Sequence, residues 1–323
     1  MPPRMLARWL ALVGVLLLAF LGTVTTLNVT LYSAPGFVYS YLDAVARHDV
    51  DGARRMPGVT ASSAGTDELL APAALASLTD IHLVRDTDDG GGRHTVLYGY
   101  TIGGSQGSSS FIVEHTGARF GVFSAWRFVD SPQSLLSVTV QNGSGVVANG
   151  VTLPRVAAGA AHPYRVLIPS RVVLTHSSTY LTAATVAARV DQPGGITTAT
   201  VDIQANPAFV REVQKQLDKF LAACTTQKVL LPTGCPMGTE ITDRLQDAPT
   251  WSIVSYPIVT IVPGAAVGSW QVPETGALAH LKVKVKSIFD GSLSTFDDDV
   301  PFTVRYLITF AGDGSPVITA QYN

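Results

Sequence analysis

The sequence predicts an α+β fold that follows a single N-terminal apolar helix. Three observations lead to this fold class. Residues 10–24 contain no charged side chain. Helical spacing of apolar residues precedes alternating strand patterns twice, in residues 35–130 and again in residues 206–323. Residues 134–204 show only strand patterns and turn dipeptides. Helices followed by strands indicate an antiparallel meander, so we expect two α+β domains that flank a small all-β module.

The apolar segment at residues 10–31 predicts a transmembrane anchor, preceded by a cytoplasmic tail at residues 1–9. About 20 apolar residues in a helix cover roughly 30 Å, the thickness of a bilayer core. Arg4 and Arg8 precede the segment, whereas no acidic residue occurs before Asp43. Because positive residues stay on the cytoplasmic side, we expect a single-pass protein of the cell membrane with a cytoplasmic N-terminus and an extracytoplasmic body.

A cleaved signal peptide is the alternative interpretation of this segment. Cleavage needs small residues one and three positions before the cut. A cut after Ala34 would place Tyr32 at the third position, and a cut after Thr25 fits only loosely. We therefore expect an uncleaved anchor, and both interpretations place the body outside the cytoplasm.

The charge of the body narrows the range of partners. After Arg4 and Arg8 are set aside, 20 basic residues face 24 acidic residues, which leaves a balance of −4. The basic residues form no cluster or stripe along the sequence, so the electrostatic footprint of a nucleic-acid-binding protein is missing. We expect the protein to associate with the membrane, and we expect no binding to nucleic acid.

Cys224 and Cys235 are the two cysteines of the chain. Outside the cytoplasm, two cysteines so close in sequence predict a disulfide, which would stabilise the fold by roughly 3 kcal/mol. A metal site is the alternative, but it needs further ligands, and no histidine lies between His176 and His280. Two free thiols are the remaining possibility. We expect the disulfide, no metal and no cofactor.

The first α+β domain is predicted in detail as three helices and four strands. Apolar residues at three- and four-residue spacing predict a helix over residues 35–48. Asp49 is placed to cap a second helix at residues 50–56, and Thr66 a third at residues 67–78. Alternation then predicts strands at residues 81–85, 94–102, 109–114 and 120–129, with glycine-rich turns at residues 88–92 and 103–107.

The all-β module and the last domain follow from the same patterns. Asn-Gly and Pro-Gly dipeptides separate module strands expected at residues 137–140, 166–175, 183–190 and 197–203. Asn206 caps a helix over residues 207–224 that begins with Pro207. The last domain then continues with a short helix at residues 239–245 and strands at residues 250–261, 268–272, 278–290, 300–310 and 317–322.

Three segments resemble known groups of proteins. Residues 37–53, which read FVYSYLDAVARHDVDGA, resemble the start of the nuclear-transport-factor-2-like fold, also called the cystatin-like cone. The middle segment looks like the small β modules of bacterial envelope proteins. Residues 217–224 and 231–236 look like a recurrent part of actinobacterial membrane-anchored envelope proteins of unknown function. The resemblance implies two cone-like domains, each with a curved sheet around its helices and a pocket inside, and no activity that can be transferred to particular residues.

Four aromatic residues of the first domain are the candidate pocket. Tyr98 and Tyr100 lie two apart on one predicted strand, and Trp126 and Phe128 two apart on another. Members of each pair share a sheet face, while Arg127 points the opposite way. These rings could line a cone that holds an apolar or ring-shaped ligand. They could equally fill the core or cover the outer face.

The motifs that suggest catalysis or metal binding have simpler interpretations. Residues 103–107 match the G-x-S-x-G pattern, but a nucleophile elbow needs a following helix, and a strand follows here. The seven histidines show no metal-binding spacing on a helix. Residues 297–299, three consecutive aspartates, lack the alternation of a calcium loop and are interpreted as a solvated turn before a strand at Val300. We expect no catalytic residues.

These observations predict a non-enzymatic membrane-anchored protein of the cell envelope. Its body would bind an envelope protein or a wall component, or act as a structural accessory. Two alternatives belong to other classes of function. One is a small-molecule or lipid-binding protein that uses the pocket of the first cone, and the other is a hydrolase or isomerase whose site is not recognisable in the sequence.

Overall fold

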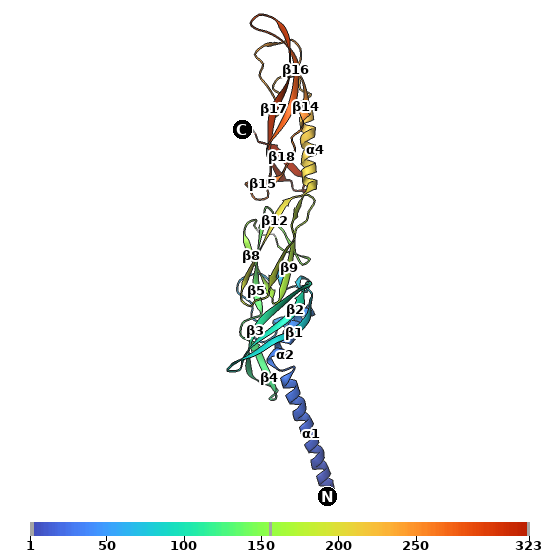
Figure 1. Cartoon of the computed structure of the whole chain (residues 1–323), viewed down its shortest axis with the longest axis vertical. Coiled ribbons are helices and arrows are strands. Elements are labelled where there is room, and N and C mark those ends of the chain that lie inside the picture. The colour runs from blue at the N-terminus through green and yellow to red at the C-terminus, as the bar shows by residue number, and fades with distance from the viewer. Residues whose placement is uncertain (1–2, 155–156, 322–323) are drawn as a thin grey trace.

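The chain forms a long rod in the computed structural model, which describes residues 3–154 and 157–321. Helix α1 (Pro3–Val29) makes one end of the rod, and the hairpin of two long strands makes the opposite end (Figure 1). The first α+β domain, the all-β module and the last domain follow each other along the axis between these ends. The α+β class and the N-terminal apolar helix are confirmed.

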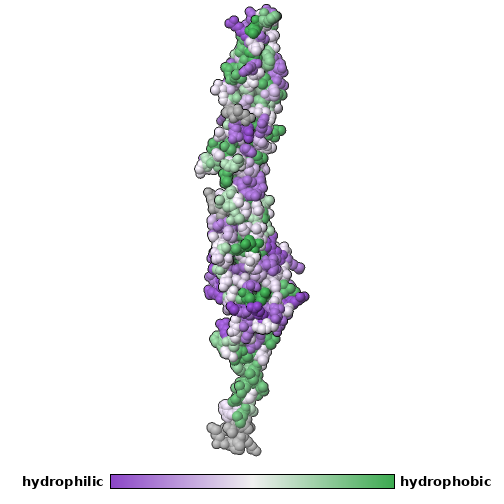
Figure 2. All heavy atoms as spheres, turned by 90° about the vertical axis from the view of Figure 1, so that its left-hand side faces the viewer, coloured by the Kyte–Doolittle hydropathy of each residue, from purple (hydrophilic) through white to green (hydrophobic). Residues whose placement is uncertain are grey.

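Helix α1 contains an apolar span, Trp9–Val29, long enough to cross a membrane. The protein itself buries none of this span, and Figure 2 shows it as a hydrophobic surface at one end of the rod. Leucine and valine side chains along the span are exposed. Because that much apolar surface is unfavourable in water, the helix fits a membrane anchor or a signal sequence.

Two capped helices begin the first domain. Helix α2 (Ala34–Ala46) is capped by Ser33, whose hydroxyl accepts from the Gly36 N–H at 3.1 Å. Helix α3 (Val50–Arg54) is capped by Asp49, as the sequence predicts. The third predicted helix, at residues 67–78, is wrong. Two single turns stand there, η1 (Glu68–Leu70) and η2 (Pro72–Ala74), because Pro72 lacks an N–H and forces the preceding residue into an extended conformation.

An antiparallel sheet completes the first domain and packs on α2. Its order is β1-β2-β3-β4, the predicted meander. The first three strands are longer than the sequence pattern indicates, and the fourth, predicted at residues 120–129, is shorter. The buried side of the sheet meets Val38, Tyr41 and Leu42 of α2. The four strands are β1 (Leu78–Gly90), β2 (Arg93–Ile102), β3 (Ser105–Arg119) and β4 (Phe123–Phe128).

The middle module consists of two four-stranded β-sheets. The first has the order β10-β12-β5-β8, in which β12 and β5 are parallel, and the second has the order β11-β9-β6-β7. Their strands are β5 (Gln133–Gln141), β6 (Val147–Ala148), β7 (Val151–Thr152), β8 (Ala161–Leu167), β9 (Ser170–Thr175), β10 (Leu181–Ala183), β11 (Val186–Val190) and β12 (Ile196–Ala205).

The last domain packs one amphipathic helix against a sheet. In α4 (Pro207–Cys224), Asn206 accepts from the N–H groups of Ala208 and Phe209, and the predicted apolar stripe is buried. No helix forms at residues 239–245, where the chain is extended. The six strands are β13 (Arg244–Leu245), β14 (Thr250–Ser255), β15 (Val262–Pro263), β16 (Trp270–Lys286), β17 (Leu293–Phe310) and β18 (Pro316–Ala320).

The strands of the last domain differ from the predicted ones in length. The predicted strands at residues 268–272 and 278–290 are one continuous strand, β16, which Gly276 does not interrupt. Its partner β17 begins at Leu293, well before the predicted start at Val300. Cross-strand pairing along the whole hairpin extends both strands beyond their apolar segments, and alternation in the sequence does not reveal that pairing.

Candidate functional site

Tyr98 and Tyr100, two of the four predicted pocket residues, are buried on β2 and hydrogen-bonded inside the protein. The Tyr98 hydroxyl donates to the Pro35 carbonyl at 3.0 Å, and the Tyr100 hydroxyl lies 2.7 Å from Ser109 Oγ. Burial raises the pKa of Tyr98 to about 12 and also raises the pKa of Tyr100. Both hydroxyls therefore stay protonated. The Tyr98 hydroxyl connects β2 to α2, and the Tyr100 hydroxyl connects β2 to β3.

Trp126 and Phe128 on β4 contact the helical part of the chain. Phe128 is buried, with its ring centroid 4.9 Å from that of Phe37 and 5.3 Å from that of Tyr41. Trp126 is half-buried, and its indole N–H donates to the Tyr32 carbonyl at 2.8 Å. The four rings thus pack within the first domain, which forms the base of the rod next to α1. Tyr98 and Tyr100 also line two different surface hollows.

The hollow beside Tyr98 is open to solvent and has a volume of about 570 Å³. It lies at the outer end of α1, where Leu31, Tyr39 and Leu83 also line it. Asp86 lines one side, and its carboxylate is 2.8 Å from His94 Nδ1. Across the described residues, no hydroxyl or thiol is hydrogen-bonded to His94, so this pair orients an imidazole without an adjacent nucleophile.

A charged ladder crosses the outer face of the last sheet. His280 on β16 lies 2.8 Å from Asp297 through Nε2 and 2.8 Å from Asp299 through Nδ1. Because carboxylates only accept, this arrangement favours the protonated imidazole, in which both ring nitrogens donate. The bond to Asp299 raises the pKa of His280, and the Lys282 ammonium lowers that of Asp297.

This ladder corrects the interpretation of residues 297–299 as a solvated turn. The three aspartates lie inside β17, opposite residues 280–282 of β16. Among the residues that the structure describes, no group of three or more His, Cys, Asp or Glu side chains could hold a metal ion. Asp297 and Asp299 instead pair with cations across the strand, a contact that stabilises a sheet.

Cys224 and Cys235 form the predicted disulfide, with their Cα atoms 5.9 Å apart. The bond joins the last residue of α4 to the loop that follows. Cys224 is buried, and the nearby Trp251 indole donates to the Val229 carbonyl at 2.8 Å within the same loop. The disulfide therefore fastens an irregular segment against the helix and the sheet.

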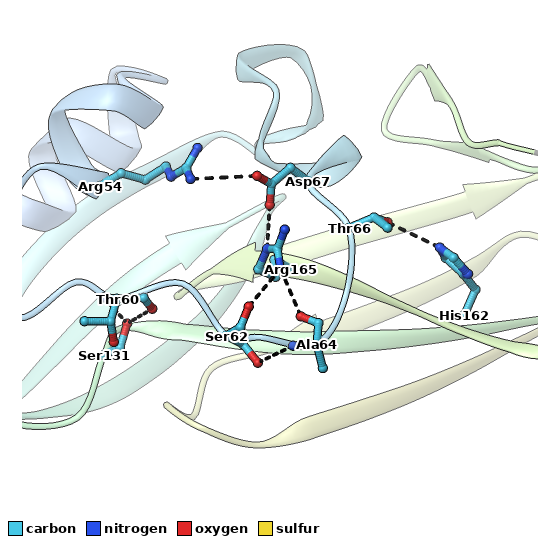
Figure 3. Close-up of polar contacts among 9 residues, drawn as sticks. All are labelled: Arg54, Thr60, Ser62, Ala64, Thr66, Asp67, Ser131, His162 and Arg165. Atoms are coloured by element: carbon cyan, nitrogen blue, oxygen red, sulfur yellow. Dashed lines mark hydrogen bonds and ion pairs between the residues drawn. The ribbon is translucent and has the colours of Figure 1, made fainter.

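Arg165 of the middle module binds an extended segment of the first domain, which we call the strap (Figure 3). The strap, residues 60–67, runs along β8. Arg165 Nε is 2.5 Å from Asp67 Oδ1, and Nη1 donates to the carbonyls of Ser62 and Ala64 at 2.8 and 3.2 Å. Thr66 adds backbone hydrogen bonds to Pro163 and to Arg165 itself. One side chain thus joins two domains through three separate bonds.

Three further side chains connect the first domain to the middle module, and we call this set of contacts the joint. The buried Tyr41 hydroxyl donates to the Pro132 carbonyl at 2.9 Å. Asn149 donates to the Ala74 carbonyl at 2.6 Å, and Arg189 Nη1 donates to the Gln106 carbonyl at 2.7 Å. Gly107 makes room for this arginine, since a Cβ there would stand 1.4 Å from Nη2. These contacts hold the first domain and the module in one orientation.

The end of the rod opposite α1 carries an apolar turn. This distal tip, residues 287–293, joins β16 to β17 (Figure 1). Ile288, Phe289 and Leu293 are 75%, 97% and 73% exposed. Asp290 organises the turn by accepting from the N–H and hydroxyl of Ser292 at 3.0 and 2.8 Å. The apolar side chains therefore project from an ordered turn.

Sequence reasoning finds the disulfide but misses the joint and the distal tip. Arg165 and its strap are about a hundred residues apart, so no local pattern connects them. Asp290-Gly291 is a turn dipeptide that could have revealed the tip, but the prediction ended a strand at Asp290. Comparison with protein-family models, with curated proteins and with solved structures gives no match, so the proposed function depends on the geometry.

Proposed function

We propose that this chain is a non-enzymatic accessory of the cell envelope, held in the cell membrane by α1 and reaching a partner with its distal tip. The N-terminus would remain in the cytoplasm and the rod would stand outside it. In this proposal residues 35–130 are a cone-like domain, which the order of α2, α3 and then β1 to β4 supports. The chain would then belong with the actinobacterial envelope proteins that it resembles.

The observation that carries the proposal is the separation of two apolar ends by a stiff body. The apolar span of α1 is at one end and the distal tip is at the other (Figure 1). The polar joint through Arg165 and Tyr41 holds the first domain on the module, and the Tyr180 ring of the module stacks on Phe310 of the last domain with centroids 6.0 Å apart. A rod of this form holds its far end at a fixed height above the membrane, which suits an adaptor or a spacer.

The chemistry of the distal tip favours a protein partner over a wall polymer. Ile288 and Leu293 are aliphatic, and their burial is favourable only in an apolar environment, at about 25 cal/mol per Å². Phe289 is an aromatic anchor of the type that dominates protein interfaces. Sugars and peptides of the wall are largely polar, so an apolar pocket on another envelope protein is the better match.

Photo-crosslinking in the native membrane tests the proposal. A photoreactive amino acid would replace Phe289 in the full-length protein, and Ile196, which is 67% exposed in the middle of the rod, provides the matched control. We expect a discrete adduct from position 289 that is missing from position 196. Adducts of equal yield at both positions, or adducts only at 196, would contradict the role of the tip.

The hollow beside Tyr98 supports a second candidate function, the binding of a small molecule or lipid. Its lining combines apolar Leu31 and Leu83 with the hydroxyl-bearing Tyr39. A ligand that binds the folded state raises the melting temperature of the protein. A thermal-shift screen of full-length protein with lipids and wall fragments would detect such a ligand, and Leu83→Glu should abolish the shift if the hollow is the site.

A further inference from the structure

The hairpin of β3 and β4 lies directly against the outer end of α1 (Figure 1). Asn28 makes the connection with both halves of its amide. Its Nδ2 donates to the Val122 carbonyl at 2.8 Å, and its Oδ1 accepts from the Ser124 N–H at 2.8 Å. The rings of Tyr32 and Phe123 stack beside this contact with centroids 4.4 Å apart. The hairpin is therefore fixed to the helix.

The contact places the hairpin at the level where the helix leaves the membrane. Asn28 belongs to the apolar span Trp9–Val29. Val24, Leu27 and Asn28 are half-buried while their neighbours on α1 are exposed, and this three- and four-residue spacing marks one helix face. The end of the hairpin thus lies beside the last turns of the span, where headgroups surround the helix.

The turn of this hairpin presents a large apolar side chain at a position that folding does not favour. Phe120 and Gly121 both have positive φ, 54° and 76°. Asn and Gly adopt this conformation readily, whereas for a bulky residue it is an outlier. The Phe120 side chain is nevertheless 79% exposed and gains little from packing in the protein. Packing within the protein therefore does not account for a phenylalanine at this place.

The charges around the turn suit a lipid surface. No acidic residue occurs between Glu114 and Asp130. Arg119 lies beside Phe120, with its guanidinium carbon 5.2 Å from the ring centroid. The neighbouring β1–β2 turn differs, because Asp88 and Asp89 stand there. An aromatic ring next to a cation is the combination found at membrane interfaces, where the ring enters the boundary of the acyl chains and the cation meets phosphates.

We propose that the β3–β4 turn inserts Phe120 into the outer leaflet of the membrane that α1 spans, with Arg119 on the lipid phosphates. The proposal rests on the proposed function, because it requires α1 to remain in the bilayer. Because the turn lies beside α1, the lipid bilayer around α1 is the binding partner that we infer for it. Anchored at both the helix and the turn, the rod cannot rotate or lean freely about the chain segment that follows α1.

Fluorescence quenching in reconstituted vesicles tests this contact. Full-length protein carrying Phe120→Cys would be labelled with an environment-sensitive dye under non-reducing conditions and inserted into phosphatidylcholine–phosphatidylglycerol vesicles. Phe289→Cys is the matched control, since it is an exposed phenylalanine in the turn at the opposite end. Leu17→Cys, in the centre of the span, reports whether α1 is inserted. Lipids with a spin label near the headgroup serve as quenchers for positions 120 and 289, and lipids with a spin label deep in the acyl chains serve for position 17. Aqueous iodide is the reciprocal probe.

We expect the lipid quencher to reduce the emission from position 120 several-fold and to leave position 289 unchanged, with iodide showing the reverse order. If position 17 is quenched by lipid while 120 behaves like 289, the insertion of the turn is wrong and the anchor stands. If position 17 is not quenched either, the anchor itself fails. Asn28→Ala provides a second check, because loss of its two hydrogen bonds should weaken the quenching at position 120 while position 17 remains quenched.

Discussion

The first and the last α+β domains have the same order of elements but different internal supports. In the first, α2 is held by buried side chains such as Tyr41, which touches Phe111 and Phe128 and bonds to the next domain. In the last, one helix covers the sheet, and the irregular residues 225–243 are fastened by a disulfide. A helix followed by strands therefore does not determine how a domain is stabilised.

The difference matches the place of each domain along the rod. The first lies next to α1 and is joined to the module by the network around Arg165 (Figure 3). The last extends a long hairpin away from α1, with exposed ion pairs such as His280–Asp299 across its strands. Both domains have buried cores, but the last domain adds a disulfide at the end of its helix and exposed ion pairs across its hairpin.

Removal of the Tyr41 ring should have the largest effect, and it should be confined to the base. Tyr41→Ala leaves a cavity between α2 and the sheet, and we expect a loss of about 3–5 kcal/mol of stability. Tyr39→Ala on the same helix, where the side chain is 45% exposed, should cost less than about 0.5 kcal/mol. Hydrogen exchange of the full chain localises both effects, and an equal loss of protection in the last domain would contradict the comparison.

Loss of the disulfide should destabilise the opposite domain. Cys224→Ser together with Cys235→Ser opens a loop with a sequence separation of 11, and the chain-entropy model gives a cost of about 3 kcal/mol. Hydrogen exchange should rise in residues 225–243 and in α4, with the first domain unchanged. A double variant that keeps wild-type protection in α4 would show that the loop is held by its other contacts alone.

Local patterns in the sequence predict much of this fold. The spacing of apolar residues locates α2 and α4, and the predicted caps Asp49 and Asn206 locate the starts of α3 and α4, because capping depends on neighbouring residues only. Two failures have causes that outweigh the local pattern. Pro72 reduces a predicted helix to single turns, and residues 239–245 become extended because Arg244 and Leu245 pair with the distant strand β16.

The candidate sites are less predictable because they depend on distant pairs. Arg165 and its strap meet only after the module folds, and the contact between Asn28 and residue 122 joins the anchor to a hairpin nearly a hundred residues later. Alternation predicts that Trp126 and Phe128 share one sheet face, but it cannot tell a pocket wall from a packed core. That distinction depends on what stands opposite, here Phe37 and Tyr41.

Breaking the joint should have a smaller effect than either change inside a domain. Arg165→Met keeps most of the side-chain volume and removes the bonds to Asp67, Ser62 and Ala64. We expect a cost of about 1–3 kcal/mol, because the carbonyls lose a charged donor. The strap should exchange its amide hydrogens faster while α2 stays protected. Simultaneous loss of protection in α2 would mean that the strap is part of the core of the first domain.

The smallest expected effect is a pH dependence confined to the distal hairpin. The folded-state pKa of His280 is raised above the ordinary value of 6.5, chiefly by its bond to Asp299. A raised pKa in the folded state gives stability that is fully present below pH 6.5 and disappears as the pH rises through the folded-state value. His280→Gln should therefore lower the protection of β16 and β17 relative to wild type at pH 6 and leave it equal at pH 9. Asp297 keeps its Lys282 partner at both values, so a difference that persists at pH 9 would assign the effect to packing of the imidazole and not to its charge.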